Sequence, residues 1–161
     1  MHRFEGFLIN NCGALQGNAA AAACGFATDA QSARIFTYFQ SHAAEIFYDG
    51  QVRQIPLPTQ WLDTSSATHT DPESTVRTYQ NGGYWATPHH HVLPFLAAHD
   101  RGMACELLNA TIKSFRGYGI WEWIGPFFPA PVGGAPGYTA SAVNTYYASE
   151  HLRCWETADG L

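Results

Sequence analysis

The stretch TDAQSARIFTYFQSHA, residues 28–43, carries both a start signal and the apolar spacing of a helix. Thr28 and Gln31, three residues apart, form a capping box, in which each side chain satisfies a backbone N–H at the start of the helix. The apolar residues that follow recur at helical spacing: Ala33, Ile35, Phe36, Phe39 and Ala43. We therefore predict an amphipathic helix that begins at Thr28.

An alanine-rich stretch precedes this helix. Residues 11–25 have high helix propensity, and Gly25 is suited to end a helix as a C-cap. Only Phe26 and Ala27 separate this stretch from Thr28. The sequence thus predicts a helical hairpin with a very short turn, in which small alanine side chains allow close packing.

A second hairpin is predicted from Thr87 onward. Thr87 followed by Pro88 is typical of an N-cap with proline at the first helical position, and Pro94 is expected to limit or kink that helix. Asp100 is a second N-cap, and the helix behind it is expected to end at Gly117. The apolar face of that helix comprises Met103, Leu107, Leu108, Ile112 and Phe115.

Long segments rich in proline, glycine and aromatic residues separate the helices. They cover residues 50–83 and 118–137, after which a last helix, capped by Thr139, runs to about His151. Because short turns and long loops alternate, an α/α toroid would gather the long loops at one end, where they can build a pocket. The predicted fold class is all-α, with helical hairpins forming part of a toroid in one domain, residues 1–161. An ordinary helical bundle with long loops is the alternative.

The composition excludes several classes of protein. The chain has 161 residues, of which 13% are charged and 14% aromatic, so it is too apolar for intrinsic disorder. The net charge is -5 and the eight Lys and Arg are scattered, which argues against nucleic-acid and membrane partners. The apolar run at residues 19–23 is too short to span a bilayer.

The four cysteines show neither a C-x-x-C motif nor the spacing of metal ligands. They are Cys12, Cys24, Cys105 and Cys154. We interpret them as reduced, mostly buried thiols and expect a cytoplasmic protein.

Glu122 is the only carboxylate in GIWEWIG, residues 119–125. A carboxylate placed among Trp rings is a candidate for general acid or base catalysis, and Trp121 and Trp123 could stack on sugar faces or wall a pocket. The alternative is a glutamate that points outward and pairs with an arginine.

A second candidate is YQNGGYW, residues 79–85. Its two amides both donate and accept hydrogen bonds, its glycines allow close approach of backbone to a ligand, and its aromatic rings offer flat apolar surfaces. This set suits a polyol such as a sugar. The alternative is a loop built around an Asn-Gly turn.

Metal, cofactor and nucleophile motifs are not predicted. His89, His90 and His91 are adjacent on a helix, so they point about 100° apart and cannot jointly chelate one ion, although one of them could line the pocket. The sequence has no H-E-x-x-H, no G-x-S-x-G and no phosphate-binding glycine loop.

These motifs, in this order, resemble the C-terminal part of the six-hairpin glycoside hydrolases, which have an (α/α)6 toroid. The group includes trehalases, processing α-glucosidases, debranching-type glucosidases, rhamnosidases and neutral invertases. The resemblance extends over residues 12–150, through Gln16–Ala19, the hairpin at Thr28, residues 79–85, residues 119–123 and the GYTASA stretch, residues 137–142.

The resemblance implies a role for each motif. Glu122 would be the catalytic general base, and many relatives invert the anomeric configuration with a second carboxyl as general acid. Ser141 would help to close the pocket. The implied substrate-binding residues are Tyr79, Gln80, Asn81, Gly82, Gly83, Tyr84, Trp85, Trp121, Trp123 and Tyr138.

The chain departs from the family in length. A toroid of six hairpins needs twelve helices, whereas about five are predicted here, and no motif for the general acid is found. Five acidic residues are available but match no motif: Glu5, Asp49, Asp63, Asp71 and Glu73. We expect an incomplete glycosidase that self-associates or needs a complementing chain. The alternatives are a non-catalytic carbohydrate-binding or scaffold domain, and a helical protein without a sugar role.

Overall fold

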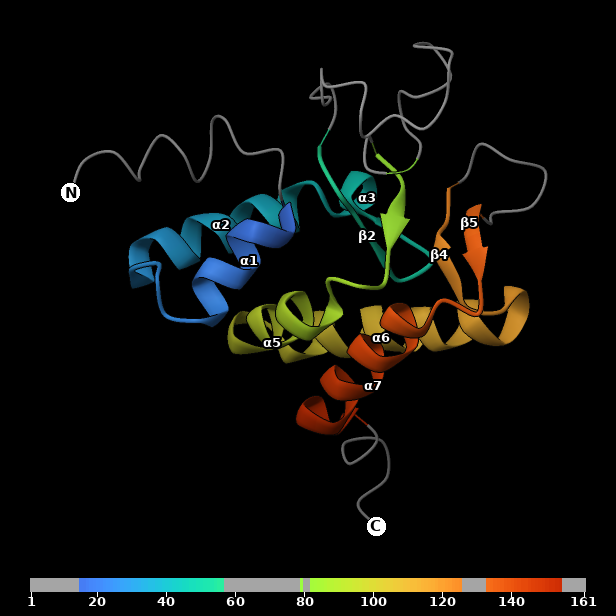
Figure 1. Ribbon diagram of the computed structural model, residues 1–161. Helices are drawn as coiled ribbons and strands as arrows, with labels where there is room; N and C mark the ends of the chain where they lie inside the picture. The colour runs from blue at the N-terminus through green and yellow to red at the C-terminus, as the bar shows by residue number, and fades with distance from the viewer. Residues whose placement is uncertain (1–14, 57–78, 80–81, 126–132, 155–161) are drawn as a thin grey trace.

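The computed structural model describes residues 15–56, 79, 82–125 and 133–154. Within these ranges 66% of residues are helical, which confirms a mostly helical protein. The six described helices are α1 (Leu15–Ala23), α2 (Asp29–Ser41), α3 (Ala43–Ile46), α5 (His89–His99), α6 (Arg101–Tyr118) and α7 (Thr139–Leu152) (Figure 1).

The first predicted hairpin is confirmed by α1 and α2. Gly25 has a φ of 75°, and the N–H of Phe26 bonds back to the carbonyl of Ala21 at 2.8 Å, which satisfies a carbonyl at the end of α1. At the start of α2 both halves of the capping box between Thr28 and Gln31 are formed. The local signals therefore fixed the turn and the helix start.

The second predicted hairpin also forms, with α5 and α6 joined through Asp100. The Asp100 side chain accepts the N–H of Met103 at 3.0 Å, so it is the N-cap of α6 as expected. Pro94 lies inside α5 and does not limit it. The N-cap of α5 is Pro88 rather than Thr87, because the helix starts one residue later than predicted.

Two other helix ends differ from the prediction by one residue each. Thr139 is the first residue of α7 rather than its cap, which is Tyr138. At its other end, α6 continues past Gly117 to Tyr118, because Gly119, with a φ of 85°, is the residue that leaves the helical conformation.

Helix α5 is the centre of the helical core. It packs against α1, α6 and α7, and its apolar positions are almost fully buried: Val92, Leu93, Phe95 and Leu96. On the side of α2, Phe39 meets Phe95 edge to face with ring centroids 5.7 Å apart. Burial of large side chains on every side of α5 explains why its helix is tolerant of a proline.

The prediction of an all-α fold is confirmed only in part, because the described chain, although mostly helical, also contains two small antiparallel sheets. One has the order β1 (Phe47–Tyr48), β2 (Gln51–Arg53), β3 (Tyr84–Trp85). The other pairs β4 (Trp121–Trp123) with β5 (Gly133–Pro136). Two backbone hydrogen bonds between Tyr84 and Ile124, of 2.9 and 2.8 Å, connect the sheets. The two sheets lie on the same side of α6 (Figure 1).

The β1–β2 turn is anchored to three helices. Asp49 and Gly50, with φ values of 46° and 80°, form the two-residue turn. The Gly50 carbonyl accepts the Thr111 hydroxyl of α6 at 2.9 Å and lies 3.0 Å from Nε2 of His89 on α5. On its other side, His89 Nδ1 lies 2.8 Å from the Thr145 hydroxyl of α7. A buried polar network thus fixes the sheet to the helices.

The interpretation of all cysteines as reduced, buried thiols is wrong. Cys105 on α6 and Cys154 after α7 form a disulfide, with Cα atoms 5.5 Å apart, and Cys24 is exposed. Cys12 lies outside the described residues. Because structural disulfides persist in oxidising compartments, the cysteines no longer support a cytoplasmic location. In the described part of the chain, no helix has the length and apolar character needed to cross a membrane.

Candidate functional site

The two motifs predicted to form the site meet where β3 bridges to the residue after β4. Tyr84 of the first motif exchanges two backbone hydrogen bonds with Ile124 of the second motif. Gly83 lies so close to Trp123 that a Cβ on Gly83 would be 3.0 Å from the indole ring. The backbones of residues 79–85 and 119–125 are therefore in direct contact. Gln80 and Asn81 lie outside the described residues.

Tyr138 joins the two motifs from a third segment. Its backbone N–H and that of Gly137 point to the carbonyl of Ile120, at 3.3 and 2.7 Å. The buried hydroxyl of Ser141 donates to the carbonyl of Trp121 at 3.1 Å. These bonds attach the start of α7 to β4, so that Tyr138 lies next to the strand that carries Glu122.

Glu122 lies opposite an irregularity in β5. Trp121 pairs with Pro136 and Trp123 with Gly133, so two residues of β5 face Glu122 alone, as in a β-bulge. The Glu122 Oε2 accepts the N–H of Ala135 at 3.2 Å. The side chain is half-buried, and this bond fixes one carboxylate oxygen. No arginine partner of the kind considered in the sequence analysis is found among the described residues.

The Tyr79 hydroxyl is electrostatically linked to this carboxylate. Partial burial raises the pKa of Tyr79, and interactions with Glu122 and then with Tyr138 raise it further. Tyr79 has a φ of 44°, its ring meets Trp85 edge to face at 5.3 Å, and its carbonyl accepts the Trp85 indole N–H at 3.2 Å. Tyr79 is thus held against Trp85 by a ring contact and a hydrogen bond.

The site residues divide by exposure. Tyr84, Trp85 and Trp123 are 5%, 6% and 4% exposed and act as packing. Four half-buried side chains keep surface that a ligand could touch: Tyr79, Trp121, Glu122 and Tyr138. Trp121 is oriented by its indole N–H, which donates to the carbonyl of Tyr118 at 2.7 Å. The accessible part of the site is therefore two tyrosines, one tryptophan and one carboxylate.

The three adjacent histidines have separate environments. His89 is fully buried in the network at Gly50, and burial lowers its pKa to about 4. The rings of His90 and His91 are in contact in a tilted arrangement, with centroids 3.8 Å apart. No group of three His, Cys, Asp or Glu in the described ranges could hold a metal ion.

Sequence reasoning missed three residues near the site. Arg53, 2% exposed, and Gln51, 1% exposed, lie buried on β2. Arg53 Nη1 lies 3.6 Å from Glu45 Oε1, and its guanidinium carbon is 5.3 Å from the centre of the Tyr84 ring. The signal available in the sequence was YDGQ, residues 48–51, because Asp-Gly is typical of a two-residue hairpin turn, which would place Gln51 and Arg53 on the second strand.

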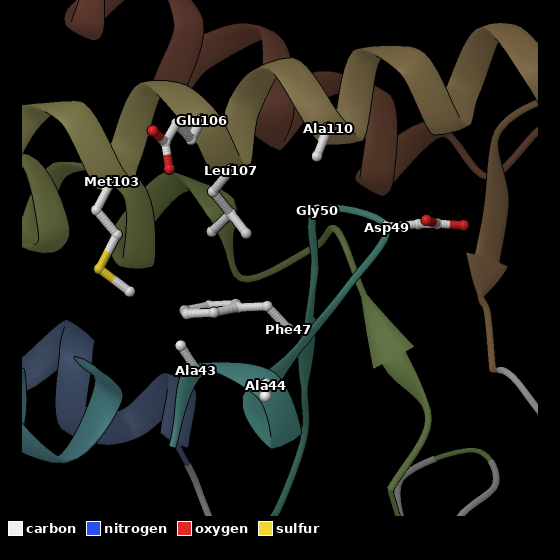
Figure 2. Close-up of a pocket in the computed structure, with 9 residues that line it drawn as sticks. All are labelled: Ala43, Ala44, Phe47, Asp49, Gly50, Met103, Glu106, Leu107 and Ala110. Atoms are coloured by element: carbon white, nitrogen blue, oxygen red, sulfur yellow. The ribbon is translucent and has the colours of Figure 1, made fainter. Parts of the chain in front are cut away.

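A pocket of about 310 Å3 lies away from the predicted site, between α6 and the α3–β1 segment (Figure 2). Its lining is mainly apolar: Ala43, Ala44, Phe47, Asp49, Gly50, Met103, Glu106, Leu107 and Ala110. Figure 2 shows the Asp49 carboxylate pointing away from the pocket. None of the sequence-predicted site residues lines this pocket.

Comparison with known proteins gives no relative: no family model, no curated protein and no solved structure matches this chain.

Proposed function

We propose that this chain is a carbohydrate-active, glycoside hydrolase-like protein in which Glu122 is the general base. The observation that carries the proposal is that backbone hydrogen bonds bring together three segments far apart in the sequence, which carry Tyr79, Glu122 and Tyr138. A half-buried carboxylate held by one backbone N–H and flanked by aromatic side chains suits the binding and activation of a water beside a sugar.

We further propose that the helices form part of an α/α toroid. In such a toroid the first helices of successive hairpins lie side by side. The first helices here are α1, α5 and α7, and α5 packs against both of the others. This order of packing supports the proposal.

The incomplete toroid would use a complementing chain or a second copy to cover its open face. The last helix supports this, because three of its large apolar side chains are mostly exposed: Val143 (55%), Tyr146 (65%) and Tyr147 (52%). The general acid would come from that partner or from residues outside the described ranges.

A non-catalytic carbohydrate-binding domain is the second candidate. The hydrogen bond from Ala135 to Glu122 favours it, because a carboxylate that satisfies a β-bulge has a structural reason to be there. In that case the aromatic side chains alone would bind the sugar.

The test combines hydrolysis with ligand binding. Disaccharides of known linkage are incubated with the chain, and the anomer released is followed by NMR. Glu122→Gln keeps an oxygen for the Ala135 N–H but removes the base, so hydrolysis should fall by about 10²–10⁴-fold. Glu150→Gln, an exposed glutamate on α7, makes the same charge change and should leave the rate unaltered.

The binding and hydrolysis measurements together separate the two candidates. Quenching of tryptophan fluorescence by an iminosugar is expected of both candidates, whereas hydrolysis that is lost in Glu122→Gln is expected of the glycosidase alone. Neither quenching nor hydrolysis at millimolar concentration would reject both.

A further inference from the structure

The pocket between α6 and the α3–β1 segment is separate from the proposed carbohydrate site. Its walls come from residues 43–50 on one side and from residues 103–110 of α6 on the other (Figure 2). Its volume of about 310 Å3 is at the lower end of the range for small-molecule sites, which is about 300–1,000 Å3. The chain therefore has space for a small ligand at residues other than Glu122.

The body of the pocket is apolar. Figure 2 shows the Phe47 ring between Ala43 and the side chains of Met103 and Leu107. Phe47 and Met103 are half-buried, so both keep surface that a ligand can contact. The face of an aromatic ring attracts apolar groups and cations, and the flexible thioether of methionine adapts to the shape of a bound group. A ligand of this pocket therefore needs an apolar body.

Among the described residues, one carboxylate at the edge of the pocket has no ion-pair partner. It belongs to Glu106, whose side chain is exposed. The other carboxylate of the lining, that of Asp49, points away from the pocket (Figure 2). The positions three and four residues from Glu106 on α6 carry no basic side chain: Gly102, Met103, Asn109 and Ala110. The charge at the pocket is thus negative, which favours a cation and disfavours an anion.

The described lining offers few hydrogen bonds to a neutral polar ligand. The Gly50 carbonyl already accepts the Thr111 hydroxyl at 2.9 Å and lies 3.0 Å from His89 Nε2. Apart from the two carboxylates, the lining side chains carry no hydroxyl, amide or ring nitrogen. A sugar would lose more hydrogen bonds to water than it could form here, so the pocket is unsuited to a carbohydrate.

We infer that this pocket binds a small organic cation, in which a protonated amine is attached to an apolar body. The ammonium group lies at Glu106 and the body lies between Phe47 and Met103. An alkylamine has a pKa close to that of lysine, about 10.4, so it is charged at neutral pH. The inference is independent of the proposed function, because it concerns other residues and another class of ligand.

The test uses 2-phenylethylamine as the cation, with 2-phenylethanol and 3-phenylpropanoate as its neutral and anionic counterparts. The whole chain, labelled with 13C in its methionine methyl groups, is titrated with each compound and followed by NMR. The sequence has two methionines, Met1 and Met103, so the signal that is lost in Met103→Leu belongs to Met103. We expect the amine at millimolar concentration to give a saturable shift of this signal. The alcohol should bind more weakly, and the carboxylate should give no saturable shift.

Ala110→Phe tests whether the ligand enters the pocket. The Ala110 Cβ points from α6 toward the β1–β2 turn (Figure 2), so a phenyl group on it would occupy the space between them. We expect the amine to cause no saturable Met103 shift in this variant. Ala33→Phe, at an exposed position on α2, is the matched control and should bind the amine like wild type.

Glu106→Gln tests the role of the charge, and because the side chain is exposed this variant covers the case in which Ala110→Phe fails to fold. The affinity for the amine should fall by about threefold to fivefold, as for the loss of one exposed ion pair, whereas the affinity for the alcohol should stay the same. Glu150→Gln on the exposed side of α7 makes the same charge change and should leave both affinities unaltered.

Three results would overturn the inference. The first is equal affinity for the amine and the alcohol in wild type, and the second is a Met103 shift that persists in a folded Ala110→Phe. The third is the absence of any saturable shift with the amine. The proposed function is tested separately, because Glu122→Gln should bind the amine like wild type whether or not the chain hydrolyses a glycoside.

Discussion

Two sets of buried polar groups lie close together on the β1–β2 hairpin. The groups of one set are hydrogen-bonded, whereas atoms of the other set have no hydrogen-bond partner. At Gly50 every described group is paired, from the carbonyl through Thr111 and His89 to Thr145. One to three residues later, Arg53 and Gln51 leave three buried atoms without partners. The first set holds the hairpin on the helices, whereas the second leaves buried donors and an acceptor without hydrogen bonds. Buried polar groups on one hairpin can therefore differ widely in what they contribute to stability.

The largest effect on stability is expected from Gly50→Ala, which disrupts the hydrogen-bonded network around the Gly50 carbonyl. A Cβ at Gly50 would lie 2.6 Å from the Leu107 carbonyl oxygen and would overlap the Thr111 backbone, at a φ of 80°. We expect a loss of more than about 4 kcal/mol in the free energy of unfolding, measured with urea.

Gly25→Ala is the matched control for this substitution. Gly25 has a similar φ of 75° but nothing within 4 Å of the added Cβ, so only the backbone strain of about 1–2 kcal/mol remains. An equal loss in the two variants would contradict the role given to the Gly50 contact.

Removal of the disulfide is expected to have the next largest effect. It joins α6 to Cys154, two residues after the end of α7, and these helices supply Thr111 and Thr145 to the network at Gly50. With a sequence separation of 49 residues, the chain-entropy account gives a loss of about 4 kcal/mol for Cys105→Ala. Thermal unfolding would show this, and Cys24→Ala, at an exposed free thiol, should change stability by less than about 0.5 kcal/mol.

The pH dependence of stability should report on His89. Its folded pKa of about 4 lies below the ordinary value of 6.5, so the unfolded chain binds a proton that the folded chain excludes. Stability is then lost as the pH falls from about 6.5 to about 4, by about 3 kcal/mol in total, and levels off below that.

The histidine contribution can be isolated by difference. The loss attributed to His89 is the difference between urea titrations of wild type and His89→Gln across this pH range. Curves that run parallel would show that another group is responsible.

The smallest effect on stability is expected from substitution of Arg53, which has buried donors without hydrogen-bond partners. Arg53→Met removes two unpartnered donors together with one ion pair and one ring contact. Because the two lost donors have no partner to leave unsatisfied, and because Glu45 is 30% exposed and can be hydrated when Arg53 is removed, we expect a change below about 1 kcal/mol. A loss as large as that of Gly50→Ala would mean that Arg53 has a structural role instead.

Helix starts could be predicted because their signals are local. Thr28 with Gln31, and Asp100 with Met103, are contacts three residues apart, so the sequence contains both partners. The end of the first helix at Gly25 is of the same kind. Pro94 shows the limit of local rules, because packing of α5 against three other helices overrides the intrinsic cost of the proline.

The strands and the cysteine pairing could not be predicted in the same way. Strands of two to four residues are too short to show a period of two, although Asp49-Gly50 was a hairpin signal that went unused. The partners of Cys105 and of Arg53 depend on which segments meet in space. In contrast, the meeting of residues 79–85 with 119–125 was expected from the resemblance, whereas the burial of Tyr84, Trp85 and Trp123 was not.

The bond between Cys105 and Cys154 closes the chain into a covalent ring that contains most of α6, both strands of the smaller sheet and all of α7. A single proteolytic cut anywhere inside that ring opens it without releasing a fragment. Glu122, which lies inside the ring, would stay attached to the rest of the chain after such a cut. The two pieces would migrate separately on a gel only after reduction.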